Sequence, residues 1–131
     1  MVMPKTAAIA AEPSVSLERA GLDAAACLFH GFSDPNRLII LRHLALGEHR
    51  VVDLMSHLGL AQSTVSKHLA CLKDCGLVDS RPQGRASLFS LIHPEAVLDL
   101  LAAAEQLLGL TGDAVTLCPN FGTDTLIRDA R

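Results

Sequence analysis

Aromatic residues are scarce, with no tryptophan, no tyrosine and only four phenylalanines among the 131 residues. This composition argues against a working surface that stacks bases on aromatic rings. The longest apolar stretch, residues 96–110, is interrupted by Asp99, Glu105 and Gln106, so it does not indicate a membrane span. The alanine-rich run behind Lys5 is too short for the apolar core of a secretory leader. We therefore expect a cytoplasmic protein with no membrane partner.

A strong excess of one charge is also missing, because the formal net charge is −3 at pH 7. That value argues against a protein that binds nucleic acid without regard to sequence. Residues 62–85 nevertheless hold four basic and two acidic side chains, namely Lys67, Lys73, Arg81 and Arg85 against Asp74 and Asp79. A polyanionic partner should therefore meet the chain in this segment.

The length and the apolar content of 50% indicate one domain with a real core. We expect three parts: a flexible arm over residues 1–16, a folded domain over 17–110 and a C-terminal tail over 111–131. The arm contains prolines and alanines without a hydrophobic pattern. The domain should open with a helix from about residue 17 to 32, whose inward candidates are Leu22, Cys27 and Leu28.

A helix start signal stands at residues 33–35, where Ser-Asp precedes a proline at the first helical position. The helix that it opens should run from Asn36 to Leu46 and end at Gly47. Its apolar residues at helical spacing are predicted to face the core, and its basic side chains are predicted to point elsewhere. The first group comprises Leu38, Leu41 and Ala45, and the second comprises Arg37, Arg42 and His43.

Two short helices with a tight glycine-containing turn between them come next. The first covers residues 51–58 and ends at Gly59; the second opens at 61–64, runs to Cys75 and stops at Gly76. Its inward stripe should comprise Val65, Leu69 and Leu72. This layout is typical of a helix-turn-helix.

Beyond these helices the hydrophobic pattern changes to that of short strands. Residues 77–80 and 86–91 are predicted strands, joined by a basic turn over 81–85. The last helix should span residues 94–108, and its apolar residues lie on several sides, which is typical of a helix buried between subunits. The expected fold class is therefore mainly α with a β-hairpin wing, a dimeric winged helix-turn-helix.

The polar start of the second short helix predicts a surface for operator double-stranded DNA. Side chains there suit hydrogen bonds to base edges and phosphates from a helix N-terminus in the major groove, and a basic wing tip could enter a neighbouring groove. The candidates are Gln62, Ser63, Thr64, Ser66, Lys67, His68 and Arg85. The alternative is that the polar residues only cap the helix and that Arg85 is a solvated turn residue.

Four unevenly spaced cysteines favour metal or redox chemistry over a disulfide framework in a cytosolic protein. Cys71 and Cys75 lie one helical turn apart on one flank of the second short helix, so they can hold one soft cation. Cys118, in the irregular tail, is the candidate third donor. Because the helix thiols lie near a helix C-terminus, where the dipole disfavours thiolates, metal must displace protons and binding should weaken as the pH falls. Core packing is the alternative role for all three.

The other candidate ligands have simpler explanations. Cys27 is expected to be a core residue beside Leu28. The histidines at positions 30, 43, 49 and 57 lack ligand spacing and are predicted to be surface or cap residues. His68 lies on the thiol flank, where contact with phosphate or packing between helices is favoured over weak ligation.

Three segments together resemble the ArsR/SmtB family of metal-responsive repressors. They are Phe32-Ser33-Asp34-Pro35-Asn36-Arg37-Leu38, Val52-Asp53-Leu54 and Gln62-Ser63-Thr64-Val65-Ser66-Lys67-His68-Leu69. Residues 71–76, with a downstream tail cysteine, are similar to the cadmium- and lead-sensing branch of that family, called CmtR. This resemblance implies a three-thiolate site of Cys71, Cys75 and Cys118, with the tail cysteine supplied by the other subunit.

Other branches of the family fit the sequence less well. Sensors that use a Cys-x-Cys pair would need thiols near Arg50 and Val52, where there are none. Zinc sensors with ligands along the final helix would need a second histidine there, and none follows His93.

The sequence therefore predicts a homodimeric repressor that leaves its operator when Cd²⁺ or Pb²⁺ binds, with Zn²⁺ as an alternative inducer. A thiol redox switch on the same fold is a second alternative, although a bridge between Cys71 and Cys75 would strain the helix. An enzyme is not expected, because the sequence shows no cysteine–histidine constellation with a third orienting group.

Overall fold

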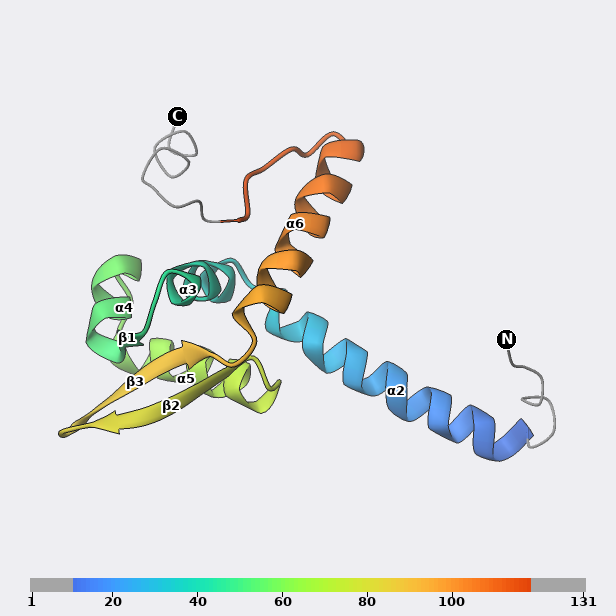
Figure 1. Cartoon of the computed structure of the whole chain (residues 1–131), viewed down its shortest axis with the longest axis horizontal. Helices are drawn as coiled ribbons and strands as arrows, with labels where there is room; N and C mark the ends of the chain where they lie inside the picture. The colour runs from blue at the N-terminus through green and yellow to red at the C-terminus, as the bar shows by residue number, and fades with distance from the viewer. Residues whose placement is uncertain (1–10, 119–131) are drawn as a thin grey trace.

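The computed structural model describes residues 11–118, with side chains from residue 15 onward (Figure 1). The elements of this part are α2 (Ala11–Gly31), α3 (Pro35–Ala45), β1 (His49–Arg50), α4 (Val51–Leu58), α5 (Gln62–Asp74), β2 (Val78–Gln83), β3 (Ala86–Leu91) and α6 (Pro94–Leu110). The order is the predicted one, with β1 as an addition. Within the described part, none of the helices combines the length and apolar character that a membrane crossing needs.

Helix α3 begins where the sequence predicts. The carboxylate of Asp34 accepts hydrogen bonds from the backbone N–H groups of Asn36 (2.9 Å) and Arg37 (3.1 Å), and Pro35 occupies the first turn. These bonds, above all the one from Arg37, hold the pKa of the Asp34 carboxyl below its ordinary value. The start of α3 is therefore marked by a local capping signal.

The inward face of α3 is only partly the predicted one. Leu41 is fully buried, and Leu38 and Ala45 pack half-buried against the core, as expected. The prediction for Arg37 was wrong, because this side chain is only 9% exposed. Its guanidinium turns inward to satisfy backbone carbonyls at the end of α2, which a hydrophobic pattern cannot reveal.

Helices α4 and α5 form the predicted helix-turn-helix. Gly59 ends α4 with a φ of 68°, a left-handed conformation that favours glycine. Helix α5 buries Val65, Leu69 and Leu72, the predicted stripe, and ends at Asp74, close to the predicted stop. The burial of this stripe fixes which side chains of α5 face outward.

The wing is an antiparallel sheet with the strand order β1-β3-β2. The two-residue strand β1 was not predicted; it pairs with β3 through His49↔Phe89 and Arg50↔Leu88. A strand of this length has no periodic pattern of its own and exists because β3 supplies its hydrogen-bond partners.

The turn of the β2–β3 hairpin is shorter than predicted. Strand β2 extends to Gln83, which pairs with Ala86 and leaves Gly84 (φ 62°) and Arg85 at the tip. Arg81 therefore lies in β2, where its guanidinium forms a bidentate ion pair with the carboxylate of Glu48 (2.8 and 2.9 Å). Of the two basic residues in the predicted turn, only Arg85 lies at the tip.

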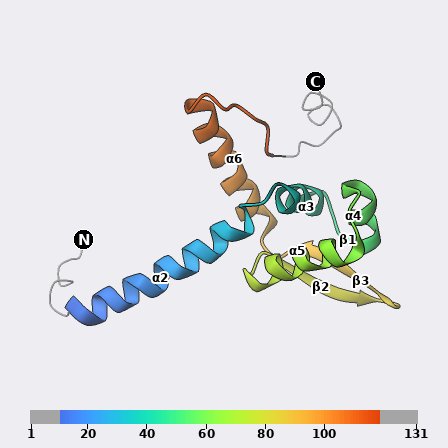
Figure 2. The ribbon, with the colours of Figure 1, turned by 180° about the vertical axis from the view of Figure 1, so that it is seen from behind.

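The core gathers apolar side chains from all the helices except α2 and from the wing: Ile40, Leu41, Leu44, Leu54, Val65, Leu69, Leu72, Leu77, Val78, Leu91, Val97 and Leu101. Helix α2 extends away from it as a separate rod, as Figures 1 and 2 show from opposite sides. This helix begins at Ala11, inside the predicted arm. In the single chain Leu22 (59%) and Cys27 are exposed, so their predicted inward position was wrong, whereas Leu28 packs against the core.

Candidate nucleic-acid interface and thiol site

The first turns of α5 present polar side chains to solvent. Gln62, Ser63, Ser66 and Lys67 are exposed, and Thr64 is half-buried. Ser63 and Lys67 lie opposite the buried stripe of α5, so the packing of the helix leaves them free to meet a partner. The helix N-terminus adds exposed N–H groups and the positive end of the helix dipole, both suited to phosphate.

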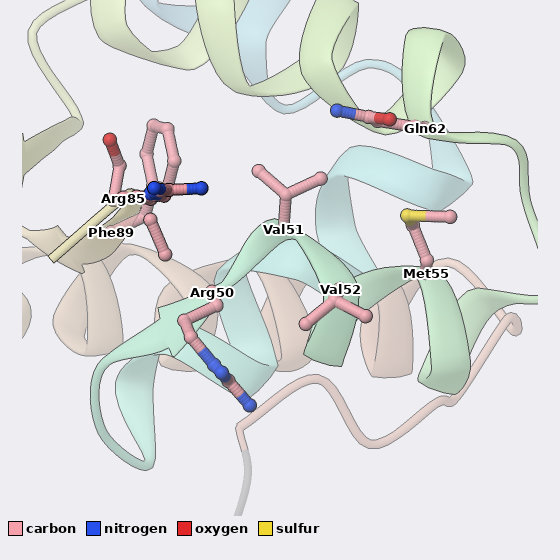
Figure 3. A pocket seen from close by; sticks show the side chains of 9 residues that line it. Arg50, Val51, Val52, Met55, Gln62, Arg85 and Phe89 are labelled. Carbon is pink, nitrogen blue, oxygen red and sulfur yellow. The ribbon is translucent and has the colours of Figure 1, made fainter. Parts of the chain in front are cut away.

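A hollow beside this helix start joins it to the wing (Figure 3). Gln62 from α5, Arg85 from the wing tip and Arg50 from β1 all line it, together with Val51 and Met55 of α4. The predicted residue Arg85 thus shares one concave surface with the start of α5. Arg50, which sequence analysis did not select, lies there because β1 pairs with β3.

His68 is placed differently from the other predicted DNA contacts. Its Nε2 lies 3.8 Å from the carboxylate of Asp34, and its Nδ1 lies 3.5 Å from the guanidinium of Arg37. Arginine can only donate, so Nδ1 accepts and the ring proton sits on Nε2, facing Asp34. With 15% of its side chain exposed, His68 mainly links α5 to the start of α3.

The thiols at the end of α5 have a neighbour that sequence analysis assigned to the core. Cys75 Sγ lies 3.3 Å from Cys27 Sγ and donates a hydrogen bond to the Cys27 carbonyl (3.0 Å). Cys71 is half-buried on the same flank. Burial first, then the hydrogen bond with Cys27 and the nearby Cys71, raise the pKa of Cys75 to about 11. At neutral pH Cys75 is therefore a thiol, which supports the expectation that a metal must displace its proton.

Close packing between α2 and α5 brings these cysteines together. A Cβ atom added at Gly31 would lie 3.1 Å from Leu77 Cδ1 and 3.5 Å from Cys75 Sγ. A glycine eases this close approach, because a side chain at position 31 would press on the Leu77 methyl group and require it to shift. Gly31 is the one sequence signal that could have pointed to a contact between α2 and α5.

Cys118 lies at a different place in the chain. Its Sγ is 3.6 Å from the carbonyl of Leu98, and its backbone N–H donates to the carboxylate of Glu105, so the tail is tied to α6. Burial and the Glu105 carboxylate raise the pKa of the Cys118 thiol. Among the described side chains, Cys71, Cys75 and Cys118 do not converge within the distance that a shared ion requires. Within one chain the structure therefore brings Cys27 beside Cys75 and leaves Cys118 apart.

Three histidines do converge, contrary to the prediction that they are scattered. Ligand-capable nitrogens of His43, His49 and His57 all lie within 4.8 Å of one another. The rings of His43 and His57 stack at a centroid distance of 4.3 Å. Burial and the two neighbouring imidazoles lower the pKa of His43 to about 4. The signal that could have revealed them is that each stands at an end of its element, where consecutive elements meet.

Comparison with known proteins agrees with this architecture. Residues 34–80 match the family described as "Bacterial regulatory protein, arsR family". The chain is 35% identical over 96 residues to a protein of Streptomyces lividans named "Probable mercury resistance operon repressor", covering 73% of this chain and 76% of that protein. It is 43% identical over 68 residues to the regulator CmtR of Mycobacterium tuberculosis (strain ATCC 25618 / H37Rv), covering 52% of this chain and 58% of that one.

Solved structures show the same fold. NolR from Sinorhizobium fredii superposes with a TM-score of 0.64 at 28% identity, over 75% of this chain and 93% of that one. A homodimeric winged helix-turn-helix DNA-binding domain from Mycobacterium bovis superposes with a TM-score of 0.60 at 29% identity, over 70% and 89% of the two chains. The chain belongs to the ArsR family of bacterial regulatory proteins.

Proposed function

We propose that this protein is a metal-responsive transcriptional repressor that binds operator DNA as a homodimer and therefore acts in the cytoplasm. The observation that carries the proposal is that the two ends of α5 hold different kinds of side chain. Its N-terminal turns hold the exposed polar residues, and its C-terminal turn holds Cys71 and Cys75. In this proposal, the residues that contact DNA and the thiols that bind metal therefore stand on the same helix. Relatives named as mercury, arsenical and CmtR regulators support a metal as the signal.

Operator recognition in this proposal rests on α5 and the wing. Gln62, Ser63 and Thr64 would read base edges, while Ser66, Lys67 and Arg85 would contact the backbone or an adjacent groove. His68 would support the helix from behind, through its contacts with Asp34 and Arg37. A second copy would present the same surface to the other half-site.

The inducer in this proposal is a soft divalent ion, Cd²⁺ or Pb²⁺, with Zn²⁺ as the alternative. Cys71 and Cys75 fit such an ion, because sulfur donors on one helix flank suit thiophilic metals. The third donor is Cys118, supplied by the other subunit as the family resemblance implies. Cys27 is a rival third donor, because its Sγ already lies 3.3 Å from that of Cys75.

Release from DNA follows from the position of the thiols. Once Cys71 and Cys75 are ligands, the end of α5 is held to whichever segment carries the third thiol. That restraint changes the spacing or the freedom of the two reading helices. If the inducer binds the DNA-incompetent state more tightly, DNA must weaken inducer binding by the same factor.

A cadmium titration of the reduced protein, followed through the ultraviolet absorbance of thiolate-to-metal bonds, tests this site. We expect a strong band that saturates at one ion per subunit and weakens in Cys71→Ser, Cys75→Ser and Cys118→Ser. The matched variant Cys27→Ser should keep the full band. A band that weakens in Cys27→Ser and survives in Cys118→Ser would move the third ligand to α2. A wild-type protein without any band would contradict metal sensing at these thiols.

Thiol oxidation is a second candidate function, favoured by the 3.3 Å contact between Cys27 and Cys75. A peroxide would convert one thiol to a sulfenic acid and release water; the other thiol would then attack that sulfur and release a second water, leaving a disulfide. Peroxide should then abolish operator binding by the wild type and leave Cys27→Ser active. Equal operator binding before and after peroxide would remove this candidate.

A further inference from the structure

We propose that His43, His49 and His57 form a second metal site, separate from the thiols, that takes a borderline divalent ion such as Zn²⁺. The three imidazoles come from three consecutive elements: the last turn of α3, the start of β1 and the last turn of α4. Their nitrogens lie within 4.8 Å of one another, close enough for one ion to reach all three.

The donor chemistry selects the class of ion. Imidazole nitrogen suits zinc, nickel and copper, whereas soft cadmium and lead favour the sulfur donors of the other site. Three histidines with a fourth position open to water are a known zinc arrangement. Exposed His57 and half-buried His43 and His49 leave that fourth position accessible to solvent.

One of the ligands is already oriented by its surroundings. His49 Nδ1 lies 2.8 Å from the carbonyl oxygen of Gly47, and a carbonyl can only accept, so Nδ1 carries the proton. The lone pair of His49 is therefore on Nε2, the nitrogen left for an ion. Hydrogen bonds of this kind fix the tautomer of metal-binding histidines.

Nearby charges both oppose and favour a cation at this place. Arg42, beside His43, opposes it. The carboxylate of Asp53 lies close enough to His49 to sense its charge and favours it, although Asp53 is engaged mainly by Arg50. The two charges act in opposite directions on a bound cation.

A bound ion would join parts that otherwise meet only through packing and the short β1–β3 ladder. Helix α4 is the first helix of the helix-turn-helix, and β1 is hydrogen-bonded to the wing strand β3. Coordination by His43, His49 and His57 would fasten both to the end of α3. The expected consequence is a zinc-dependent rise in the melting temperature of the DNA-binding unit.

The test compares zinc binding by the reduced full-length wild type, His57→Gln and the matched control His30→Gln. His57 is exposed and stands in the last turn of α4, so its replacement should leave the fold intact. We expect the wild type and His30→Gln to bind one more zinc ion per chain than His57→Gln. Zinc should also shift the side-chain ¹⁵N resonances of His43, His49 and His57 in the wild type.

The cadmium–thiolate band provides an independent readout, because it should be the same in all three proteins. His49→Gln should also bind one zinc ion fewer than the wild type. Agreement between the two variants shows that the loss comes from the three-histidine site and not from a side effect of replacing His57. Equal zinc stoichiometry in the wild type and His57→Gln, with unmoved imidazole resonances, would overturn the second site. A missing thiolate band with an intact zinc difference would instead contradict only the proposed thiol sensor.

Discussion

Arg37 is the one charged side chain among the buried residues of the described part. Its guanidinium donates to the carbonyls of His30 (2.7 Å) and Gly31 (3.2 Å) and to the hydroxyl of Ser33 (3.2 Å), and it approaches the ring of His68. These contacts satisfy the exposed end of α2 and hold α5 against α3. The arginine in the segment that resembles the family is therefore engaged inside the protein.

Replacement of Arg37 by alanine should lower the free energy of unfolding by about 2–4 kcal/mol, because several partly buried acceptors lose a charged donor at once. Urea unfolding followed by circular dichroism measures the loss. Arg81→Ala is the matched control. Arg81 forms an exposed ion pair with Glu48, so its replacement should lower the free energy of unfolding much less. Equal unfolding midpoints for the two variants would show that the Arg37 contacts contribute little.

The protonated thiol of Cys75 predicts how metal binding depends on pH. Its pKa of about 11 lies well above neutral pH, so each metal-binding event must release this proton. Apparent cadmium affinity should therefore rise with pH, by about tenfold per pH unit for each thiol proton displaced. Competition with a chelator between pH 6 and 8 gives the slope, and Cys75→Ser should reduce it by about one proton. An affinity that does not change over this range would contradict coordination by a protonated thiol.

At the scale of single elements, α5 performs two tasks with different ends. Lys67, among the first turns, is exposed, whereas Lys73, near the end, donates to Ser80 (3.2 Å) and lies 3.9 Å from Asp79. Lys73 is therefore engaged by the wing, whereas Lys67 is open to solvent. This difference allows a matched comparison.

Lys67→Ala should weaken operator binding at every sequence to a similar degree, because a phosphate contact carries no base preference. The slope of log affinity against log salt should fall by about one for each half-site. Fluorescence anisotropy with a labelled operator over a series of salt concentrations measures both effects. Lys73→Ala should keep the wild-type slope, and a slope unaltered in Lys67→Ala would remove this residue from the interface.

The elements that the sequence predicts well are those with local signals. Asp34 and Pro35 mark the start of α3, and Gly59 ends the first helix of the helix-turn-helix. Strand β1 and the meeting of Cys27 with Cys75 depend on partners far away in the chain, so no periodicity encodes them. The inward turn of Arg37 depends on nearby backbone carbonyls at the end of α2, which hydrophobic periodicity does not report. The assignment of the DNA contacts and of Cys71, Cys75 and Cys118 as ligands stays a prediction.

At the scale of the whole molecule, α2 and α6 expose large apolar side chains that the single chain leaves uncovered. The large exposed side chains are Val15, Leu17, Leu22 and Phe29 on α2, and Leu107 and Leu110 on α6. They stand on the two helices that extend from the core (Figure 1). A second copy of the chain would cover them, in line with the proposed homodimer and with the expectation that the last helix lies between subunits.

Leu107→Glu should therefore convert the protein to a monomer, because it places a charge in the apolar contact, whereas Gln106→Glu, on the neighbouring exposed residue, should leave the dimer intact. Sedimentation velocity distinguishes the two, and a Leu107→Glu protein that remains dimeric would exclude α6 from the interface. The monomer should bind the operator at least about a hundredfold more weakly, since it engages one half-site at a time.

The monomeric variant Leu107→Glu also distinguishes between the two possible third ligands of the thiol site. A site completed by Cys118 of the partner subunit would lose part of its cadmium–thiolate band in the monomer, whereas a site completed by Cys27 of the same chain would keep all of it.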